Sequence, residues 1–285
     1  MELFRALGAL AEPPAPEHRA LAAALGLGEP PAAADHDDLF TFQLYPYASV
    51  YLGAEGMLGG EARDRIAGFW RALGQAPPPE PDHLSVLLAL YARLGELEAA
   101  ASEPEVGGRW RHARKALFWE HLLSWLPAYL AKLSQIAPPF YRRWGELLAA
   151  ALASEAAALE PQASLPLHLR EAPPMADPRE GDAEAFLAAL LAPVRSGIIL
   201  VRSDLDRAAR ELELGSRIGE RKFVLRALLG QDSAATLRWL AAEARRWAGL
   251  HHGQPEAFAP VAAFWADRAR AAAALLAELA ASDDR

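Results

Sequence analysis

Apolar residues recur every three or four positions along most of the chain. Alanine and leucine dominate these positions, whereas runs in which valine, isoleucine or threonine alternate with polar residues are missing. A spacing of three to four places side chains on one face of an α-helix, and strict alternation is what a half-buried strand needs. The sequence therefore predicts an all-α fold.

Prolines and glycines divide the first half of this pattern into separate helices. Pro127 lies inside the longest one and should kink it, because proline lacks the amide that bonds to the carbonyl four residues back. Glycines 56, 59 and 60 weaken the first turns of another helix. The predicted helices of this half lie at residues 1–11, 16–26, 37–44, 55–73, 83–100, 109–135 and 139–159.

Residues 160–180 contain five prolines and no periodic pattern, which is typical of a linker or a long surface loop. We therefore expect an N-terminal helical region at 1–159 and a C-terminal helical region at 181–285 that packs on or beside the first. Together they would form a single helical domain with a C-terminal helical extension. The helices predicted in the extension lie at residues 180–192, 197–214, 217–229, 232–249 and 255–281.

The most polar junction of the first half precedes its most apolar helix. A proline-rich stretch at 77–81 carries Glu80 and leads directly into Asp82 and His83. Asp82 is a natural N-cap for the helix at 83–100, because a carboxylate accepts hydrogen bonds from the free amides of a first turn. That helix is apolar on nearly all sides, so we expect it to be central and buried.

Composition and charge narrow the class of protein. The chain of 285 residues carries a formal net charge of −8 and has no cysteine, which excludes thiolate metal sites and disulfides and disfavours nucleic acid as a partner. The N-terminus has an acidic residue where an export signal needs basic ones. No apolar run is long enough to cross a bilayer. We therefore expect a cytoplasmic protein without stable membrane insertion.

Motifs of the common enzyme classes are missing. The sequence has no HExxH metal motif, nucleophile elbow, phosphate-binding glycine loop or dinucleotide fingerprint. We therefore predict a protein that is not an enzyme and has no cofactor or metal of its own.

Three interpretations of the polar junction stay open at this point. The carboxylates and imidazoles of Glu80, Asp82 and His83, joined by Glu120 and His121 from the next helix, could bind a divalent metal, as in a metal-dependent helical hydrolase. A simpler interpretation makes Asp82 a cap and both histidines core residues. The third is a polar spot that binds a peptide.

The stretch 201–248 suggests a competing function. It carries ten basic and seven acidic residues, net +3, on short capped helices, as a helix-turn-helix DNA-binding regulator would. Acidic residues interleave with the basic ones, which favours a solvated amphipathic face. The same patch could dock the acidic surface of a large client protein.

Several pieces of the first half resemble one known family in their order along the chain. The pieces are Tyr47-Ala48-Ser49-Val50-Tyr51 with a glycine-rich turn after it, Glu80-Pro81-Asp82-His83-Leu84, His121-Leu122 with Trp125, and Phe140-Tyr141. On these pieces, the sequence from about residue 40 to 157 resembles the TorD/DmsD/NarJ-like chaperones. The family motif is Glu-Pro-x-Asp-His; this chain lacks the spacer, so Asp82 and His83 carry over more directly than Glu80.

The resemblance implies a helical cytoplasmic chaperone for the maturation of a molybdopterin oxidoreductase. Such a chaperone binds the twin-arginine signal peptide of the catalytic subunit and holds it until the cofactor is inserted. No nucleic acid is expected as a partner, and the protein would be a monomer or a homodimer.

A receptor for such a peptide needs an acidic spot for the basic region and an apolar groove for the rest. Glu80 and Asp82 would supply the acidic spot. Tyr47 and Tyr51, which we expect in a loop, are the best aromatic candidates for the groove, although any one aromatic residue is more often part of the core. Phe69 and Tyr129 are further candidates for its lining. The predicted peptide-binding set is Glu80, Asp82, His83, Tyr47, Tyr51, Trp70, His121 and Trp125.

Overall fold

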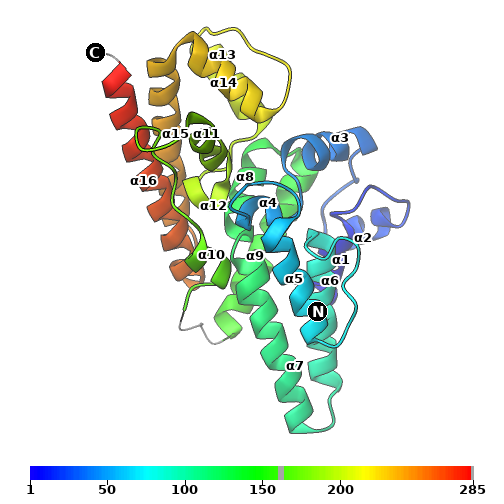
Figure 1. Cartoon of the computed structure of the whole chain (residues 1–285). Coiled ribbons are helices and arrows are strands. Elements are labelled where there is room, and N and C mark those ends of the chain that lie inside the picture. The colour runs from blue at the N-terminus through cyan, green and yellow to red at the C-terminus, as the bar shows by residue number, and fades with distance from the viewer. Residues whose placement is uncertain (160–163, 284–285) are drawn as a thin grey trace.

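The computed structural model describes residues 1–159 and 164–283, and within these ranges every regular element is a helix (Figure 1). The predicted all-α fold is confirmed. The one strand-like feature in the described part is an isolated antiparallel bridge between Tyr47 and His83.

The first ten elements of the described chain are helices or helical turns, two of them wide π-type turns. They are α1 (Glu2–Ala9), α2 (His18–Ala24), α3 (Ala33–Asp37), the π turn η1 (Asp38–Gln43), α4 (Ala48–Leu52), α5 (Gly60–Ala72), α6 (Leu84–Ala100), α7 (Pro104–Ala116), the π turn η2 (Leu117–Leu123) and α8 (Leu126–Ile136).

The remaining elements begin with a long helix that ends before the proline-rich stretch. They are α9 (Pro139–Ala158), α10 (Leu167–Glu171), α11 (Ala183–Leu191), α12 (Pro193–Ser196), α13 (Arg202–Glu211), α14 (Arg221–Gln231), α15 (Ser233–His252), the 3-10 turn η3 (Glu256–Phe258) and α16 (Ala259–Asp283).

The helix predicted at 109–135 is interrupted instead of merely kinked. It begins earlier, at Pro104, widens into η2, and breaks at Ser124 and Trp125 before α8 begins. Pro127 lies in the first turn of α8, where its missing amide costs no intrahelical hydrogen bond. Proline therefore starts a new helix here.

Two predicted helix starts were too early. The helix expected at 55–73 begins at Gly60, because glycines 56 and 59 adopt positive φ in the turn that precedes it. The helix expected at 197–214 begins at Arg202, since residues 198–201 have no helical hydrogen bonds and are buried as an irregular segment.

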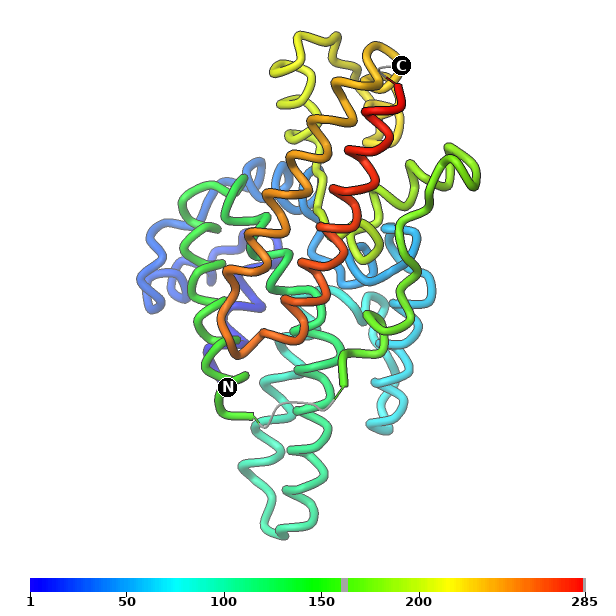
Figure 2. The backbone as a smooth tube through the Cα atoms, turned by 90° about the vertical axis from the view of Figure 1, so that its left-hand side faces the viewer, coloured from blue at the N-terminus to red at the C-terminus, as the bar shows by residue number. Residues whose placement is uncertain are grey.

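The predicted linker contains a short helix. Residues 160–163 lie outside the described part, but α10 follows within the proline-rich stretch, and its Leu169 is buried. Figure 2 shows the chain from α10 to α11 running along one side of the molecule. Within its described residues, 164–180, the longest helix is the five-residue α10, which agrees with the high proline content of this stretch.

One continuous apolar core joins both halves of the chain, from Phe4 to Ala280. The predicted apolar stripe of α6 is buried, and this helix packs between α1 and α7. In the C-terminal half, α15 and α16 pack along each other as a long antiparallel pair (Figures 1 and 2). The C-terminal region therefore shares the core of the N-terminal region.

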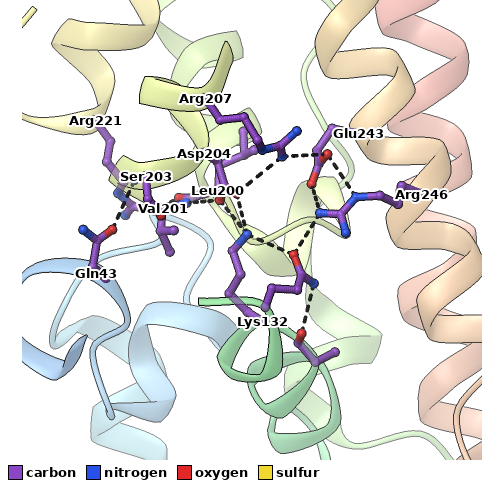
Figure 3. Close-up of polar contacts among 12 residues, drawn as sticks. Gln43, Lys132, Leu200, Val201, Ser203, Asp204, Arg207, Arg221, Glu243 and Arg246 are labelled. Atoms are coloured by element: carbon purple, nitrogen blue, oxygen red, sulfur yellow. Dashed lines mark hydrogen bonds and ion pairs between the residues drawn. The ribbon is translucent and has the colours of Figure 1, made fainter. Parts of the chain in front are cut away.

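A buried ion pair also connects the two halves (Figure 3). Lys132 of α8 is fully buried, and its Nζ lies 2.6 Å from the Asp204 carboxylate at the start of α13. The same carboxylate accepts a hydrogen bond from the Val201 amide at 2.8 Å. Burial lowers the pKa of Lys132, whereas the charge of Asp204 raises it. The Asp204 carboxylate therefore balances the charge of Lys132 and also caps the first turn of α13.

Two arginines connect the surroundings of this ion pair to α15. Arg207 donates to Glu243 of α15 at 3.0 Å, and Arg246 donates to Gln135 of α8 at 2.8 Å (Figure 3). Glu243 is itself buried and pairs with both arginines. The network therefore links α8, α13 and α15.

We expect Asp204→Ala to destabilise the fold strongly, because it leaves the Lys132 ammonium buried without a counter-charge. Breaking a buried pair in this way costs about 3–5 kcal/mol. Urea unfolding measures the change. The matched control is Asp267→Ala, whose exposed pair with Arg270 contributes less than about 1 kcal/mol. Equal losses in the two variants would contradict a structural role for the buried pair.

Candidate functional site

The proline-rich loop at 77–82 is held against the segment that precedes α4. The Ala48 amide donates to the carbonyl of Asp82 at 3.0 Å, and the Leu84 amide donates to the carbonyl of Pro46 at 2.8 Å. These two bonds form the antiparallel bridge. Residues separated by more than thirty positions in the sequence are thereby brought side by side.

Asp82 caps a different helix from the one expected. Its carboxylate is buried and accepts a hydrogen bond from the Ser49 amide at 3.2 Å, in the first turn of α4. The N-cap of α6 is His83, whose Nδ1 accepts from the Ser85 amide at 3.3 Å. The prediction that Asp82 caps α6 was wrong, because the bridge to residues 46–48 places its side chain at the amides of α4.

His83 is the centre of a small polar cluster. Its Nδ1 lies 2.6 Å from Ser85 Oγ and 3.5 Å from a carboxylate oxygen of Glu12. The Ser85 hydroxyl in turn donates to Glu12. The Tyr47 ring meets the imidazole edge-on, with ring centroids 4.7 Å apart. The cluster therefore combines residues from three distant segments.

The electrostatics of the cluster favour a neutral imidazole. Burial lowers the pKa of His83, and the carboxylates of Glu12, Glu80 and Asp82 oppose that shift. The pKa of Tyr47 is raised, first by burial and then by its hydrogen bond with Glu80 and by that charge. Glu12 and Glu80 themselves are exposed to solvent.

We call Glu12, Tyr47, Glu80, Asp82 and His83 the acidic junction. Two exposed carboxylates with a buried third one below them form a surface that attracts a cation, and carboxylates accept the forked hydrogen bonds of a guanidinium group. Sequence reasoning found four of these residues and missed Glu12. Nothing in the local pattern indicates Glu12, because it lies about seventy positions earlier and reaches the site through the packing of α1 against α6.

Two other predicted site residues belong to the core. Trp125 stacks on Tyr51, with centroids 5.2 Å apart and planes at 9°, and both side chains are fully buried. Tyr51 donates to the carbonyl of Tyr45 at 2.7 Å, and Trp125 donates to that of His121 at 2.9 Å. The expectation that Tyr51 lies in a loop was wrong, since it belongs to α4.

His121 lies in a second cluster and not at the acidic junction. Its ring faces Phe69 at 5.3 Å and His168 of α10 at 5.6 Å between centroids. Burial lowers the pKa of His121 to about 3, helped by the charge of His168. Trp70 is half-buried against the core. His121 and Trp70 therefore do not extend the acidic junction.

The metal-site interpretation finds no support in this geometry. In residues 1–159 and 164–283, no group of three or more histidine, aspartate or glutamate side chains is arranged to hold a metal ion. Glu120, one of the proposed ligands, accepts a hydrogen bond from the Leu167 amide at 2.7 Å and so supports α10.

The basic residues of 201–248 make many pairs with carboxylates. Arg207 pairs with Glu243, while Lys222 and Arg226 both pair with Glu184 of α11. These pairs agree with a solvated, salt-bridged surface more than with one prepared for phosphate groups.

The N-terminal half of the chain is similar to known proteins. Residues 9–131 match the family described as nitrate reductase delta subunit. The resemblance to the TorD/DmsD/NarJ-like chaperones is confirmed over this range. Two proteins named chaperone protein TorD, from Vibrio vulnificus strains YJ016 and CMCP6, are each 32% identical over 114 residues, which cover 36% of this chain and 52% of each relative.

The matched range contains every residue of the acidic junction and ends within α8. The chain spans about half the length of the curated relatives that it matches. Among the described helices, none is long and apolar enough to cross a membrane.

We expect Asp82→Ala to lower the stability of the fold more than Glu80→Ala. The first substitution leaves the buried Ser49 amide without its acceptor, which costs about 1–3 kcal/mol. The second removes an exposed side chain, and such changes usually stay within about 0.5 kcal/mol. Urea unfolding of both variants checks the difference, and a larger loss in Glu80→Ala would refute the assignment.

The buried histidines should make the fold sensitive to acid. Burial lowers the pKa of His121 to about 3 and that of His168 to about 4, below the value of about 6.5 in an unfolded chain. Above pH 6.5 both states are neutral and stability is unaffected. Below it the unfolded chain takes up protons that the folded chain does not, so stability falls by roughly 1 kcal/mol per pH unit per histidine down to about pH 4.

Unfolding in urea between pH 7 and pH 4.5 measures this slope. His168→Leu should reduce it, because it removes one of the buried histidines with a lowered pKa, which also include His251. The exposed His252 supplies the control, since His252→Leu should leave the slope unchanged. An unchanged slope in His168→Leu would contradict the assignment.

Proposed function

We propose that this protein is a chaperone for the maturation of a molybdopterin oxidoreductase. It binds the twin-arginine signal peptide of the catalytic subunit and withholds it until the cofactor is inserted. Its action is binding, not catalysis. The observation that carries this proposal is the acidic junction, with two exposed carboxylates around a buried His83, in the part of the chain that matches the nitrate reductase delta subunit family.

The twin arginines of the peptide pair with Glu12 and Glu80 in this proposal. Both carboxylates are exposed in the free protein, and the hydrogen bonds that they accept from Ser85 and Tyr47 leave further acceptor positions for a guanidinium group. Asp82 and His83 act as positioning residues, because their hydrogen bonds hold the loop and the α6 start beside α4. The Tyr47 hydroxyl restrains Glu80 through its hydrogen bond.

The location and partners follow from this role. A chaperone that acts before export works in the cytoplasm, with the precursor of the catalytic subunit as its partner. It acts as a monomer or a homodimer, and neither nucleic acid nor a membrane is part of the mechanism.

Calorimetry with a synthetic twin-arginine peptide tests the proposal. We expect binding that weakens with added salt, and a Kd raised about tenfold by Glu12→Gln or Glu80→Gln, because each removes a charge-assisted hydrogen bond. The matched control is Glu105→Gln, an exposed acidic residue at the start of α7. Absence of binding to the wild-type protein, or equal affinities in all variants, would refute the proposal.

A further inference from the structure

The proline-rich loop that carries Glu80 has few amides that can donate hydrogen bonds. Prolines occupy positions 77, 78, 79 and 81, and a proline has no backbone N–H. Within the loop, the His83 amide donates to the carbonyl of Glu80 at 3.2 Å. Proline restricts the shape of the loop but does not fix where the loop lies on the protein. The position of Glu80 therefore depends on contacts that reach the loop from other elements.

Arg63 of α5 supplies such a contact. Its Nη2 donates to the carbonyl of Pro79 at 2.9 Å, one residue before Glu80. The arginine side chain is 38% exposed, and its Nη1 lies 3.4 Å from the carboxylate of Asp64. Because a guanidinium group stays protonated in proteins, its hydrogen bond to the carbonyl is charge-assisted and stronger than one between neutral groups.

The helix that carries Arg63 is itself firmly held. Ile66, one turn further along α5, is fully buried in the core. Arg65 pairs with Glu61 of the same helix and with Glu171 of α10. The bond from Arg63 therefore ties the proline-rich loop to an element that is anchored both to the core and to α10.

Glu80 is restrained through its side chain and through its backbone. The Tyr47 hydroxyl forms a hydrogen bond with the Glu80 carboxylate, and Arg63 holds the carbonyl of the preceding residue. A binding group that is already held in place loses less conformational freedom when the ligand arrives. An exposed glutamate that is restrained in this way is prepared for a guanidinium group.

The charge of Arg63 gives its two conceivable roles opposite signs. A positive charge beside the acidic junction repels a basic peptide, so its removal should tighten binding, by about twofold, if charge alone mattered. Removal of a positioning contact should instead weaken binding, because fewer molecules then hold Glu80 where it can receive the peptide.

We propose that Arg63 is a positioning residue for peptide recognition and that it acts through Glu80. This inference rests on the proposed function. Arg63 does not contact the peptide; it selects the position of the loop in which the Glu80 carboxylate lies at Tyr47. The sequence gives no local indication of this role, because Arg63 precedes Pro79 by 16 positions and belongs to a different element.

Calorimetry of the full chain with the synthetic twin-arginine peptide tests this role. Arg63→Met keeps a long side chain but removes the donor, and we expect it to raise Kd about fivefold to tenfold, because one hydrogen bond that favours the competent loop is lost. The matched control is Arg71→Met, which removes the same charge from an exposed position in the last turn of α5. It should leave Kd within about twofold of the wild-type value.

A double-mutant cycle separates positioning of Glu80 from a general effect on the fold. In a Glu80→Gln protein, Arg63→Met should raise Kd no further, because the residue through which Arg63 acts has already been changed. In a Glu12→Gln protein, Arg63→Met should raise Kd by the same factor as in the wild-type protein.

The outcomes distinguish this inference from the proposed function. If wild-type protein binds the peptide and Arg63→Met leaves Kd unchanged or lowers it, the inference is overturned while the acidic junction stands. A Kd that Arg63→Met raises equally in the Glu80→Gln protein also overturns it, since Arg63 would then act on the fold as a whole. Failure of wild-type protein to bind the peptide overturns both proposals.

Discussion

The pairing of residues 46–48 with residues 82–84 is the constraint on which the acidic junction depends. Two backbone hydrogen bonds join a short extended segment to the end of the proline-rich loop. This pairing turns Asp82 toward the amides of α4 and leaves His83 to cap α6. The same pairing places the Tyr47 ring against His83 in the acidic junction.

The buried Lys132–Asp204 pair imposes the second constraint. Its residues come from α8 and α13, and it is joined to α15 through Arg207 and Glu243 (Figure 3). A charged pair removed from water tolerates little displacement, since any separation leaves charges uncompensated in a weakly polar interior. The C-terminal helices are thereby kept at a set position relative to the N-terminal region, even though the family match ends at residue 131.

Most of the fold could be predicted from the local sequence pattern. The apolar periodicity of three to four predicted the helices, and the prolines predicted where many of them begin or end. The apolar stripe of α6 predicted that this helix is buried. The glycines with positive φ explain why α5 begins later than expected. The break before α8 shows the limit of this approach, because proline was expected to bend a helix and instead begins a new one.

The site was less predictable, because its residues meet only after the chain has packed. Asp82 and His83 were recognised from the motif, but which helix each one caps depends on the bridge to Tyr47. Glu12 has no local signal at all. Trp125 and Tyr51 are aromatic, as residues that line a peptide groove often are, yet they stack on each other inside the core. Solvent exposure distinguishes aromatic residues of a binding surface from those of the core, and it can be known only from the tertiary structure.

Hydrogen–deuterium exchange of the full chain, with and without a twin-arginine peptide, tests the central claim most directly. The account predicts added protection in residues 42–58 and 80–85, which carry most of the acidic junction. Protection confined to other segments, such as α7 or the α15–α16 pair, would contradict it.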